Sequence, residues 1–248
     1  MINILVPMAG KSVYFVGSEY TSPKPLLEIG EHIMIQHVVD YLKSIQSEHR
    51  FIFVVNEDDC KKYYLDDVLK LVTDNKSIIV KQSGNTKGAV GSCLLAIDYI
   101  ENDTPLIISN SDQVIKHPIK NIIQYFNQKR ADAGVVGFTS VHPKWSYALE
   151  DDAQSSQVIE VAEKRPISKN AIAGFYYFRQ GIDFVNAAKR MIKKEASVNE
   201  LFFIAPTLNE MILENSNVLL YKISNDEYHS FYNPNKMKEY IQLVTKRN

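Results

Sequence analysis

The chain has 248 residues, and its 28 Lys and Arg against 29 Asp and Glu give a formal net charge of −1 at pH 7. This near balance excludes a nucleic-acid or anionic-membrane binder that works through bulk positive charge. Hydrophobic residues make up 45% of the chain, and Gly (10) and Pro (9) are too few for long disordered or collagen-like stretches. We therefore expect a folded protein with a sizeable core.

Two cysteines, Cys60 and Cys93, are too few for a disulfide framework or a cysteine-based zinc site, and we expect both to be buried. The first residues lack the basic and apolar regions of a signal peptide. No apolar run approaches the ~18 residues that a membrane span needs. The sequence predicts a cytoplasmic protein with no membrane or nucleic-acid partner, and it leaves a homodimer open.

Short Val- and Ile-rich runs in the first half are typical of strands covered on both faces, at 2–6, 50–56, 77–81, 106–109 and 133–139. Apolar residues recur at helical spacing from Met34 to Leu42 and from Tyr64 to Val72. We expect helices at 88–100 and 119–129 to fill the next two gaps. This alternation predicts an α/β fold with a doubly wound, mostly parallel sheet.

The second half differs because strands at 145–149, 157–161 and 172–178 follow one another without helices. They predict a small antiparallel subsheet. Helices at about 180–194 and 200–215, a strand at 218–223 and a last helix from Pro234 complete the chain. No repeat or linker interrupts it, so residues 1–248 are expected to form a single domain.

The first strand ends in a long, irregular loop, whereas loops between strands and helices usually have 2–6 residues. Ligands of open α/β sheets bind at the carboxyl ends of the strands. Ala9 and Gly10 are small enough for backbone N–H groups to approach phosphate oxygens. Pro23 and Pro25 are expected to hold Lys24 on a stiff, extended segment that suits an anion, although an ordinary exposed lysine is the alternative.

The string Pro7-Met8-Ala9-Gly10, followed by Pro23-Lys24-Pro25-Leu26-Leu27-Glu28-Ile29, resembles the sugar-phosphate nucleotidyltransferase family. It is most similar to the short members of bacterial capsule and surface-polysaccharide pathways. Members join a nucleoside triphosphate to a phosphorylated acceptor and release pyrophosphate. The resemblance implies a Rossmann-like sheet of the glycosyltransferase-A (GT-A) type, with residues 1–140 as the nucleotide-binding half and 141–248 as the acceptor-binding half.

The same resemblance assigns residues of several loops to the nucleotide. The segment from Ser83 to Ser92 follows the third strand and opens a helix, which suits a flat base or an anion. An ordinary glycine-containing turn is the alternative there. The implied nucleotide-binding residues are Met8, Ala9, Gly10, Lys11, Ser12, Gln82, Ser83, Gly88 and Ser111.

Asp112 comes directly after a buried strand, where a carboxylate is well placed to hold a hard divalent cation. The resemblance implies Mg²⁺ bound to Asp112 and to the triphosphate. Glu163 and Lys164 are similar to the family's acceptor-binding pair, and Gly174 matches the glycine that leaves room beside the acceptor. The implied catalytic residues are Lys24, Asp112 and Lys164.

Two positions depart from the family pattern. Tyr14 stands where members carry an Arg that clamps the triphosphate, and Ser12 replaces a glycine; Lys11 could supply the missing charge. Ser230 takes the place of a late metal-binding Asp, for which Asp226 or Glu227 could substitute.

We predict in-line nucleotidyl transfer without a covalent enzyme intermediate. A sugar 1-phosphate is the default acceptor of the family, and a CTP-dependent cytidylyltransferase of phosphocholine or phosphoglutamine is the alternative. A glycosyltransferase of the same fold and a non-catalytic nucleotide-binding paralogue also stay open. His142, Lys144, Trp145 and Tyr147 gather near the expected acceptor side, where Trp145 and Tyr147 alternate as packed strand residues do.

Overall fold

The computed structural model describes residues 1–10, 12, 14–15 and 20–245. The strands are β1 (Ile2–Pro7), β2 (Glu28–Ile29), β3 (His32–Ile33), β4 (His49–Asn56), β5 (Ser77–Gln82), β6 (Leu106–Ser109), β7 (Gln113–Ile115), β8 (Ala133–Thr139), β9 (Ser146–Glu150), β10 (Val158–Glu163), β11 (Asn170–Phe178), β12 (Val218–Lys222) and β13 (Tyr228–Ser230). The helices are α1 (Met34–Lys43), α2 (Glu57–Tyr63), α3 (Leu65–Val72), α4 (Ala89–Leu94), α5 (Ile97–Ile100), α6 (Ile119–Gln128), α7 (Gly181–Lys193), α8 (Thr207–Leu213) and α9 (Pro234–Thr245), with 3-10 turns η1 (Lys24–Leu26) and η2 (Asn225–Glu227).

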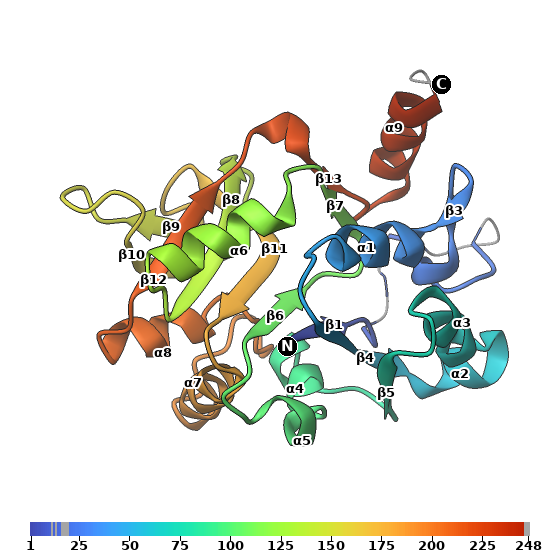
Figure 1. Ribbon diagram of the computed structural model, residues 1–248, viewed down its shortest axis with the longest axis horizontal. Helices are drawn as coiled ribbons and strands as arrows, with labels where there is room; N and C mark the ends of the chain where they lie inside the picture. Colours follow the sequence, from blue (N-terminus) through green and yellow to red (C-terminus); the bar gives the residue numbers. More distant parts are fainter. Residues whose placement is uncertain (11, 13, 16–19, 246–248) are drawn as a thin grey trace.

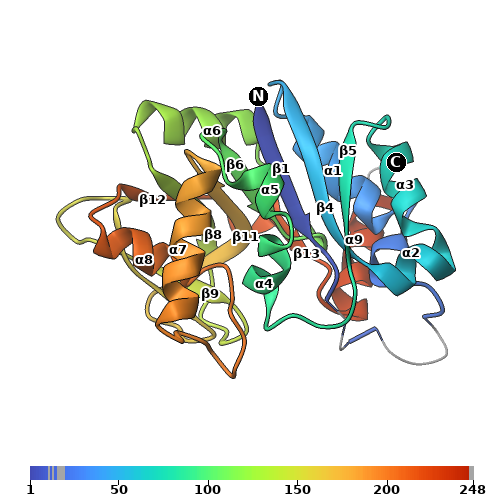
Figure 2. The ribbon, with the colours of Figure 1, turned by 90° about the horizontal axis from the view of Figure 1, so that it is seen from below.

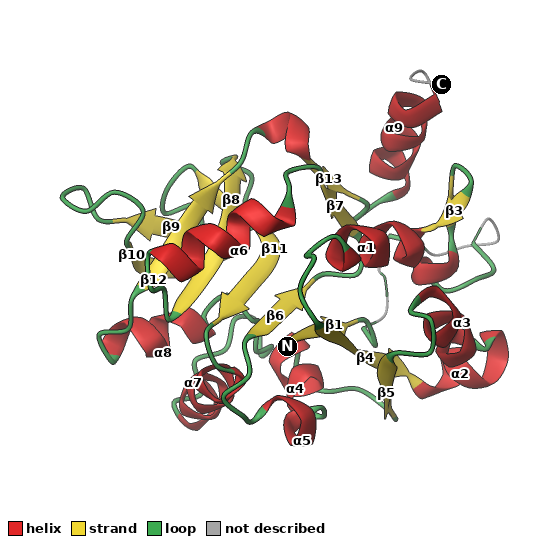
Figure 3. Cartoon of the chain, viewed as in Figure 1, coloured by secondary structure: helices red, strands yellow, loops and turns green. Residues whose placement is uncertain are grey.

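A nine-stranded mixed sheet runs through the centre of the molecule (Figure 1 and Figure 3). Its path is β10-β9-β11-β6-β1-β4-β5, and β8 pairs with β11 and β12. Strands β6, β1, β4 and β5 pair in parallel, as do β8 and β12, whereas β11 runs against both β6 and β8. The predicted α/β fold with a mostly parallel sheet is confirmed. The predicted antiparallel strands form part of this main sheet.

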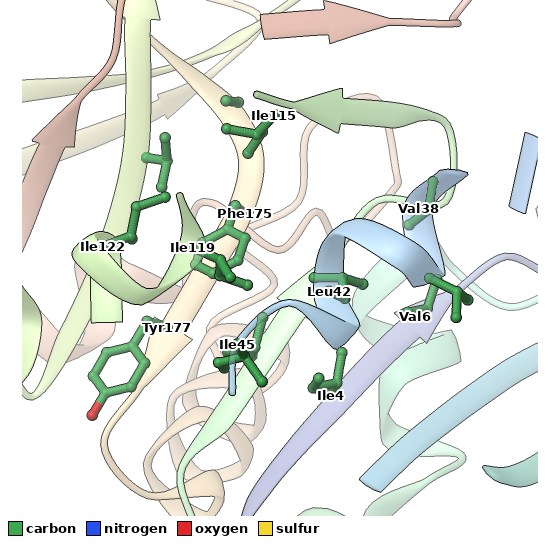
Figure 4. Packing of buried hydrophobic residues seen from close by; sticks show 14 of the residues in the cluster. Ile4, Val6, Val38, Leu42, Ile45, Ile115, Ile119, Ile122, Phe175 and Tyr177 are labelled. Atoms are coloured by element: carbon green, nitrogen blue, oxygen red, sulfur yellow. The ribbon is translucent and has the colours of Figure 1, made fainter. Parts of the chain in front are cut away.

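Helices cover both faces of the sheet, because successive side chains of a strand point to opposite faces. Ile4 and Val6 of β1 join an apolar cluster with α1, α3 and α6, part of which is shown in Figure 4. Leu5, between them, joins a second cluster with α4, α5, α7 and α8, which lie together in Figure 2. Cys60 and Cys93 are free and buried in these layers, as predicted.

Three local predictions differ from the structure. The helix expected at 88–100 is divided into α4 and α5, because Leu95 and Ala96 N–H groups bond to carbonyls three residues back. The helix expected at 200–215 begins later, after Pro206. Lys24 opens the 3-10 turn η1 instead of continuing an extended segment, and Pro25 fits this turn because its first residues need no N–H donor.

A small two-stranded sheet of β7 and β13 was not predicted. Its strands are far apart in the chain, and it brings the segment before α9 beside the end of β6 (Figure 1). Helix α9 packs on β13 and β2. In the described part of the chain, no helix is long and apolar enough to cross a membrane.

Candidate active site

The backbone of η1 fixes the position of Lys24. Pro23 is extended, with ψ 148°, and its carbonyl accepts a hydrogen bond from the N–H of Leu26 (2.9 Å). Pro25 is buried under the turn. Two proline rings and one buried contact therefore leave the Lys24 backbone little freedom, and the side chain extends from a rigid base.

The ammonium group of Lys24 forms an ion pair with the carboxylate of Asp112. The two side chains are 16% and 24% exposed, so the pair is largely shielded from water without being sealed. The Lys24 ammonium also lies 5.2 Å from the ring centroid of Phe15. The structure thus brings together two of the three predicted catalytic residues, from segments 88 positions apart in the chain.

Hydrogen bonds at Asp112 and at its neighbours Asn110 and Gln113 hold this loop in place. The carbonyl of Asp112 accepts a hydrogen bond from the N–H of Phe231 (2.7 Å). The carbonyl of Gly174 accepts from the N–H of Asn110 (3.0 Å) and from Nε2 of Gln113 (2.9 Å). Because these bonds join β6, β11 and β13, the Asp112 loop is positioned by the main sheet and the small sheet together.

Gly174 is required by this arrangement. Its φ is +57°, a conformation that side chains rarely adopt, and it lies at the register shift between β11 and β8. A Cβ at this position would lie 2.2 Å from Nδ2 of Asn110 and 2.6 Å from Oε1 of Gln113. The glycine therefore lets β11 approach the loop that carries Asp112.

Lys24 lies between two connected clefts at the carboxyl ends of β1 and β6. The cleft with Asp112 has a volume of about 320 Å³, and the cleft toward α2 about 300 Å³. Predicted site residues that line one or both are Met8, Ala9, Gly10, Ser12, Lys24, Ser111 and Asp112. Lys11 lies outside the described residues. Gly10 is open, since a Cβ there would meet nothing within 4 Å.

The predicted base-binding residues lie in the loop from β5 to α4 and line neither cleft. Gln82 is buried; its Oε1 accepts from Ser92 (2.7 Å) and its Nε2 donates to the carbonyl of Gly84 (3.1 Å). Ser83 is exposed. Gly88 has φ +96°, and a Cβ would come 2.6 Å from the carbonyl oxygen of Phe202. The close approach at Gly88 in this structure is therefore made by protein backbone.

The predicted acceptor pair lies on the far side of β11. Glu163 ends β10 and accepts a hydrogen bond from the hydroxyl of Ser146. Burial raises the pKa of the Glu163 carboxyl, and the bond from Ser146 offsets part of that increase. Lys164 is exposed, its ammonium lies 4.5 Å from the ring centroid of Phe203, and it lines neither cleft. Phe203 follows the residue that packs on Gly88.

The two departures from the family pattern occupy defined places. Ser230 pairs with Gln113 across the small sheet, next to Asp112. Asp226 lies on η2, and a hydrogen bond from Ser224 lowers the pKa of its carboxyl. Tyr14 is 58% exposed, and its ring meets that of Tyr232 edge-on with centroids 6.0 Å apart.

The oxygen donors around Asp112 fit a magnesium ion that is shared with a substrate. Mg²⁺ in proteins is commonly held by one or two carboxylates together with substrate phosphates and water. The cleft offers the Asp112 carboxylate with the oxygens of Ser111 and Asn110. Within the part of the chain that the structure describes, no cluster of three or more His, Cys, Asp or Glu could hold a metal by itself. Bound phosphates would have to complete the ligand set.

Sequence reasoning missed Asn110 and Phe15, which contact the same centre through Gly174 and Lys24. It placed Trp145 and Tyr147 near the acceptor side as core or rim packing residues. Tyr147 is indeed fully buried, but Trp145 is partly buried and lines a separate pocket with Lys144 and Tyr232. Alternation along a strand predicts the same face for Trp145 and Tyr147, but Trp145 lies just before β9 begins at Ser146. This pattern does not reveal that the Trp145 face opens toward residues almost ninety positions later.

The comparisons with known proteins agree with this geometry. Residues 19–228 match the family model described as nucleotidyl transferase. A mannose-1-phosphate guanyltransferase of Neurospora crassa is 26% identical over 181 residues, covering 71% of this chain and 49% of that protein. The chain thus spans about half the length of the curated relatives it matches.

Two solved structures share the fold. A nucleoside-diphosphate-sugar pyrophosphorylase from Vibrio cholerae has 22% identity and a TM-score of 0.83, covering 96% of this chain and 99% of that one. A UDP-glucose pyrophosphorylase in complex with UDP-glucose has 17% identity and a TM-score of 0.79, covering 100% of both chains. With a family match over most of its length, and with a lysine and an aspartate meeting at the sheet edge, this chain belongs to the nucleotidyl transferase family.

Proposed function

We propose that the protein transfers a nucleoside monophosphate from a nucleoside triphosphate to the phosphate of a phosphorylated small metabolite and releases pyrophosphate. The observation that carries this proposal is the ion pair of Lys24 and Asp112 in a cleft at the carboxyl ends of β1 and β6. The division into a nucleotide-binding half (1–140) and an acceptor-binding half (141–248) is part of the proposal.

In this reaction an acceptor phosphate oxygen attacks the α-phosphorus in line, and pyrophosphate leaves from the opposite side. The attacking phosphate is already ionised at neutral pH, so no general base is needed. Catalysis then consists of positioning and charge stabilisation. Lys24 suits this task because its rigid backbone and shielded ammonium hold one positive charge ready for the α-phosphate.

Asp112 would hold Mg²⁺ together with the triphosphate, with Ser111 and Asn110 beside it. When bound, the ion would reduce repulsion between the two phosphate groups and stabilise the charge that develops on them. Ser230 offers a neutral hydroxyl in place of a carboxylate, and Asp226 stays the predicted substitute. Removal of free divalent cation is therefore expected to abolish turnover.

Glu163, the last residue of β10, and Lys164 after it would bind the acceptor, with Lys164 on its phosphate. Since Lys164 lines neither cleft in the free protein, this role requires its side chain to turn toward Lys24. A sugar 1-phosphate is the first acceptor to test, since the named relatives act on mannose 1-phosphate or belong to the nucleotide-sugar pyrophosphorylases. Mg²⁺ as cofactor, CTP as donor, a non-sugar phosphate as acceptor, a capsule pathway and a cytoplasmic location stay predictions.

The test is a pyrophosphate-release screen that combines each nucleoside triphosphate with sugar 1-phosphates and with phosphorylated choline, glutamine and polyols. Release with one donor and one acceptor, dependent on both, supports the proposal. Nucleotide binding without release from any combination would indicate the non-catalytic paralogue. Turnover of nucleotide sugars without a triphosphate would indicate a glycosyltransferase. Either result would refute the proposed function.

A further inference from the structure

A pocket of about 340 Å³ lies between the segment before β9 and the segment that joins β13 to α9. Its walls are largely aromatic, and we call it the aromatic pocket; its lining includes Lys144, Trp145, Tyr228, Ser230, Tyr232 and Tyr240. The ring centroid of Trp145 is 5.8 Å from that of Tyr228 and 6.0 Å from that of Tyr232. These three rings therefore enclose one space from different elements.

The segment that lines one side of the aromatic pocket is hydrogen-bonded to the loop that carries Asp112. Ser230 and Tyr232 line the pocket, and the N–H of Phe231 between them donates to the carbonyl of Asp112 (2.7 Å). Tyr228, which also lines the pocket, donates a hydrogen bond from its hydroxyl to Oε1 of Gln113, the residue after Asp112 (3.1 Å). The pocket and the Asp112 loop are therefore adjacent through the 230–232 segment, although the two cavities share no lining residue among those that the structure describes.

Lys144 gives the pocket a positive charge. Its ammonium lies 3.4 Å from the ring centroid of Tyr232 and 4.4 Å from that of Trp145, so two aromatic faces hold it in place. Among the residues that the structure describes, no carboxylate forms an ion pair with Lys144, whereas Lys236 of the same pocket is paired with Glu239 (2.6 Å). The N–H donors of Lys144 are therefore available to a ligand.

We propose that the aromatic pocket binds the non-reacting end of the acceptor, and that Lys144 binds a carboxylate on that end. This inference rests on the proposed function, in which the acceptor phosphate attacks the α-phosphorus of a triphosphate held at Lys24 and Asp112. Because Lys144 is positively charged, it favours an acceptor that carries a second anionic group besides the phosphate. Lys144 is a specificity-determining residue in this scheme, not a catalytic one.

A carboxylate fits this position better than the other charged groups. The single negative charge of a carboxylate is balanced by one ammonium group. A second phosphate would leave excess negative charge beside the aromatic ring faces, whose electrostatic potential is also negative. A quaternary ammonium would have to displace Lys144 from its two rings and would be repelled by it. The pocket therefore favours acceptors that carry both a phosphate and a carboxylate.

Trp145 is the single tryptophan of the chain, so its fluorescence reports on occupancy of the pocket without any turnover. The full chain is titrated with two pairs of compounds that differ in a carboxylate: phosphoserine against phosphoethanolamine, and glucuronic acid 1-phosphate against glucose 1-phosphate. In at least one pair, the carboxylate compound is expected to bind about tenfold more tightly, which corresponds to about 1.4 kcal/mol. Phosphocholine serves as the cationic comparison.

Substitutions of Lys144 test whether this side chain causes the preference for the carboxylate compounds. Lys144→Gln is expected to remove the tenfold difference and Lys144→Arg to retain most of it. Lys120→Gln, an exposed lysine of α6 that lines no part of the pocket, is the matched control and should change nothing. Preferred binding of phosphocholine, a preference for carboxylate that survives in Lys144→Gln, or no fluorescence response in either pair would overturn the inference.

The two proposals can fail separately. If the carboxylate preference is found but no donor and acceptor release pyrophosphate, the proposed function fails and only the binding of a carboxylate by Lys144 stands. If pyrophosphate is released with neutral acceptors and Lys144→Gln leaves their KM unchanged, the proposed function stands and the pocket assignment fails.

Discussion

Replacing Lys24 by Met tests the ion pair at the centre of the site. Methionine keeps an unbranched apolar side chain above the ring of Phe15 and removes the charge. Loss of a preorganised charge of this kind costs about 3 kcal/mol of transition-state stabilisation. Turnover in Lys24→Met is therefore expected to fall about a hundredfold or more.

The cost of the same substitution to stability is expected to be small. Asp112 is left without its partner but is 24% exposed, so water can solvate its carboxylate. Partly exposed ion pairs and cation–π contacts each contribute on the order of 1 kcal/mol or less. In a chain of this size 1 kcal/mol corresponds to roughly 2–4 °C. The melting temperature of Lys24→Met should therefore fall by only a few degrees.

The assay is pyrophosphate release under saturating donor, followed beside a thermal melt. Lys43→Met is the matched control, since Lys43 forms a comparable pair with Asp74 (2.8 Å) away from both clefts. That control should keep full turnover. A folded Lys24→Met protein with turnover within about threefold of the parent, less than 1 kcal/mol in the barrier, would refute the role assigned to Lys24.

Four further outcomes are expected. Gly88→Ala should lower the melting temperature, because its Cβ would lie 2.6 Å from the carbonyl of Phe202 at φ +96°; an unchanged melt would contradict this contact. Gly174→Ala should lower both stability and pyrophosphate release, because the new Cβ would lie 2.2 Å from Nδ2 of Asn110 and would force that side chain to move. Full activity of this variant would contradict such a movement. Glu163→Gln should gain melting temperature relative to the parent as pH rises. Burial raises the pKa of Glu163, so the stability contributed by its protonated form is complete below the ordinary value of 4.5 and lost as pH rises through the folded pKa; a constant difference across pH would exclude this. Chelation of divalent cations should stop pyrophosphate release, with recovery on adding Mg²⁺ and no change in the melt of the free protein, whereas turnover that persists in chelator would rule out a metal requirement.

The strands, and the sheet edge at which Lys24 and Asp112 lie, could be predicted because they depend on local signals. Apolar runs predict buried strands, and parallel strands end at the same edge of a sheet. The loop after β1 and the residues after β6 are then expected at the same edge, and they lie close together because β1 and β6 are neighbours in the sheet. That Lys24 and Asp112, 88 positions apart, belong to one site is implied by the resemblance to the family, and their place after β1 and β6 agrees with it.

Other parts of the site depend on contacts that no local pattern reports. The pairing of Ser230 with Gln113, and the approach of Phe202 to Gly88, join segments more than a hundred residues apart. Sequence spacing indicates that Gly88 needs an unusual backbone or a close neighbour, but it cannot say whether the neighbour is a ligand or the chain itself. The same limit hid the aromatic walls around Lys144.

Transfer of label from an [α-³²P]nucleoside triphosphate tests nucleotidyl transfer most directly. With Mg²⁺ and the acceptor found by screening, all transferred label is expected on the acceptor, with unlabelled pyrophosphate as the other product and no label bound to the protein. Label recovered on the protein itself, or only in hydrolysed nucleotide, would contradict direct transfer between two phosphates held at Lys24 and Asp112.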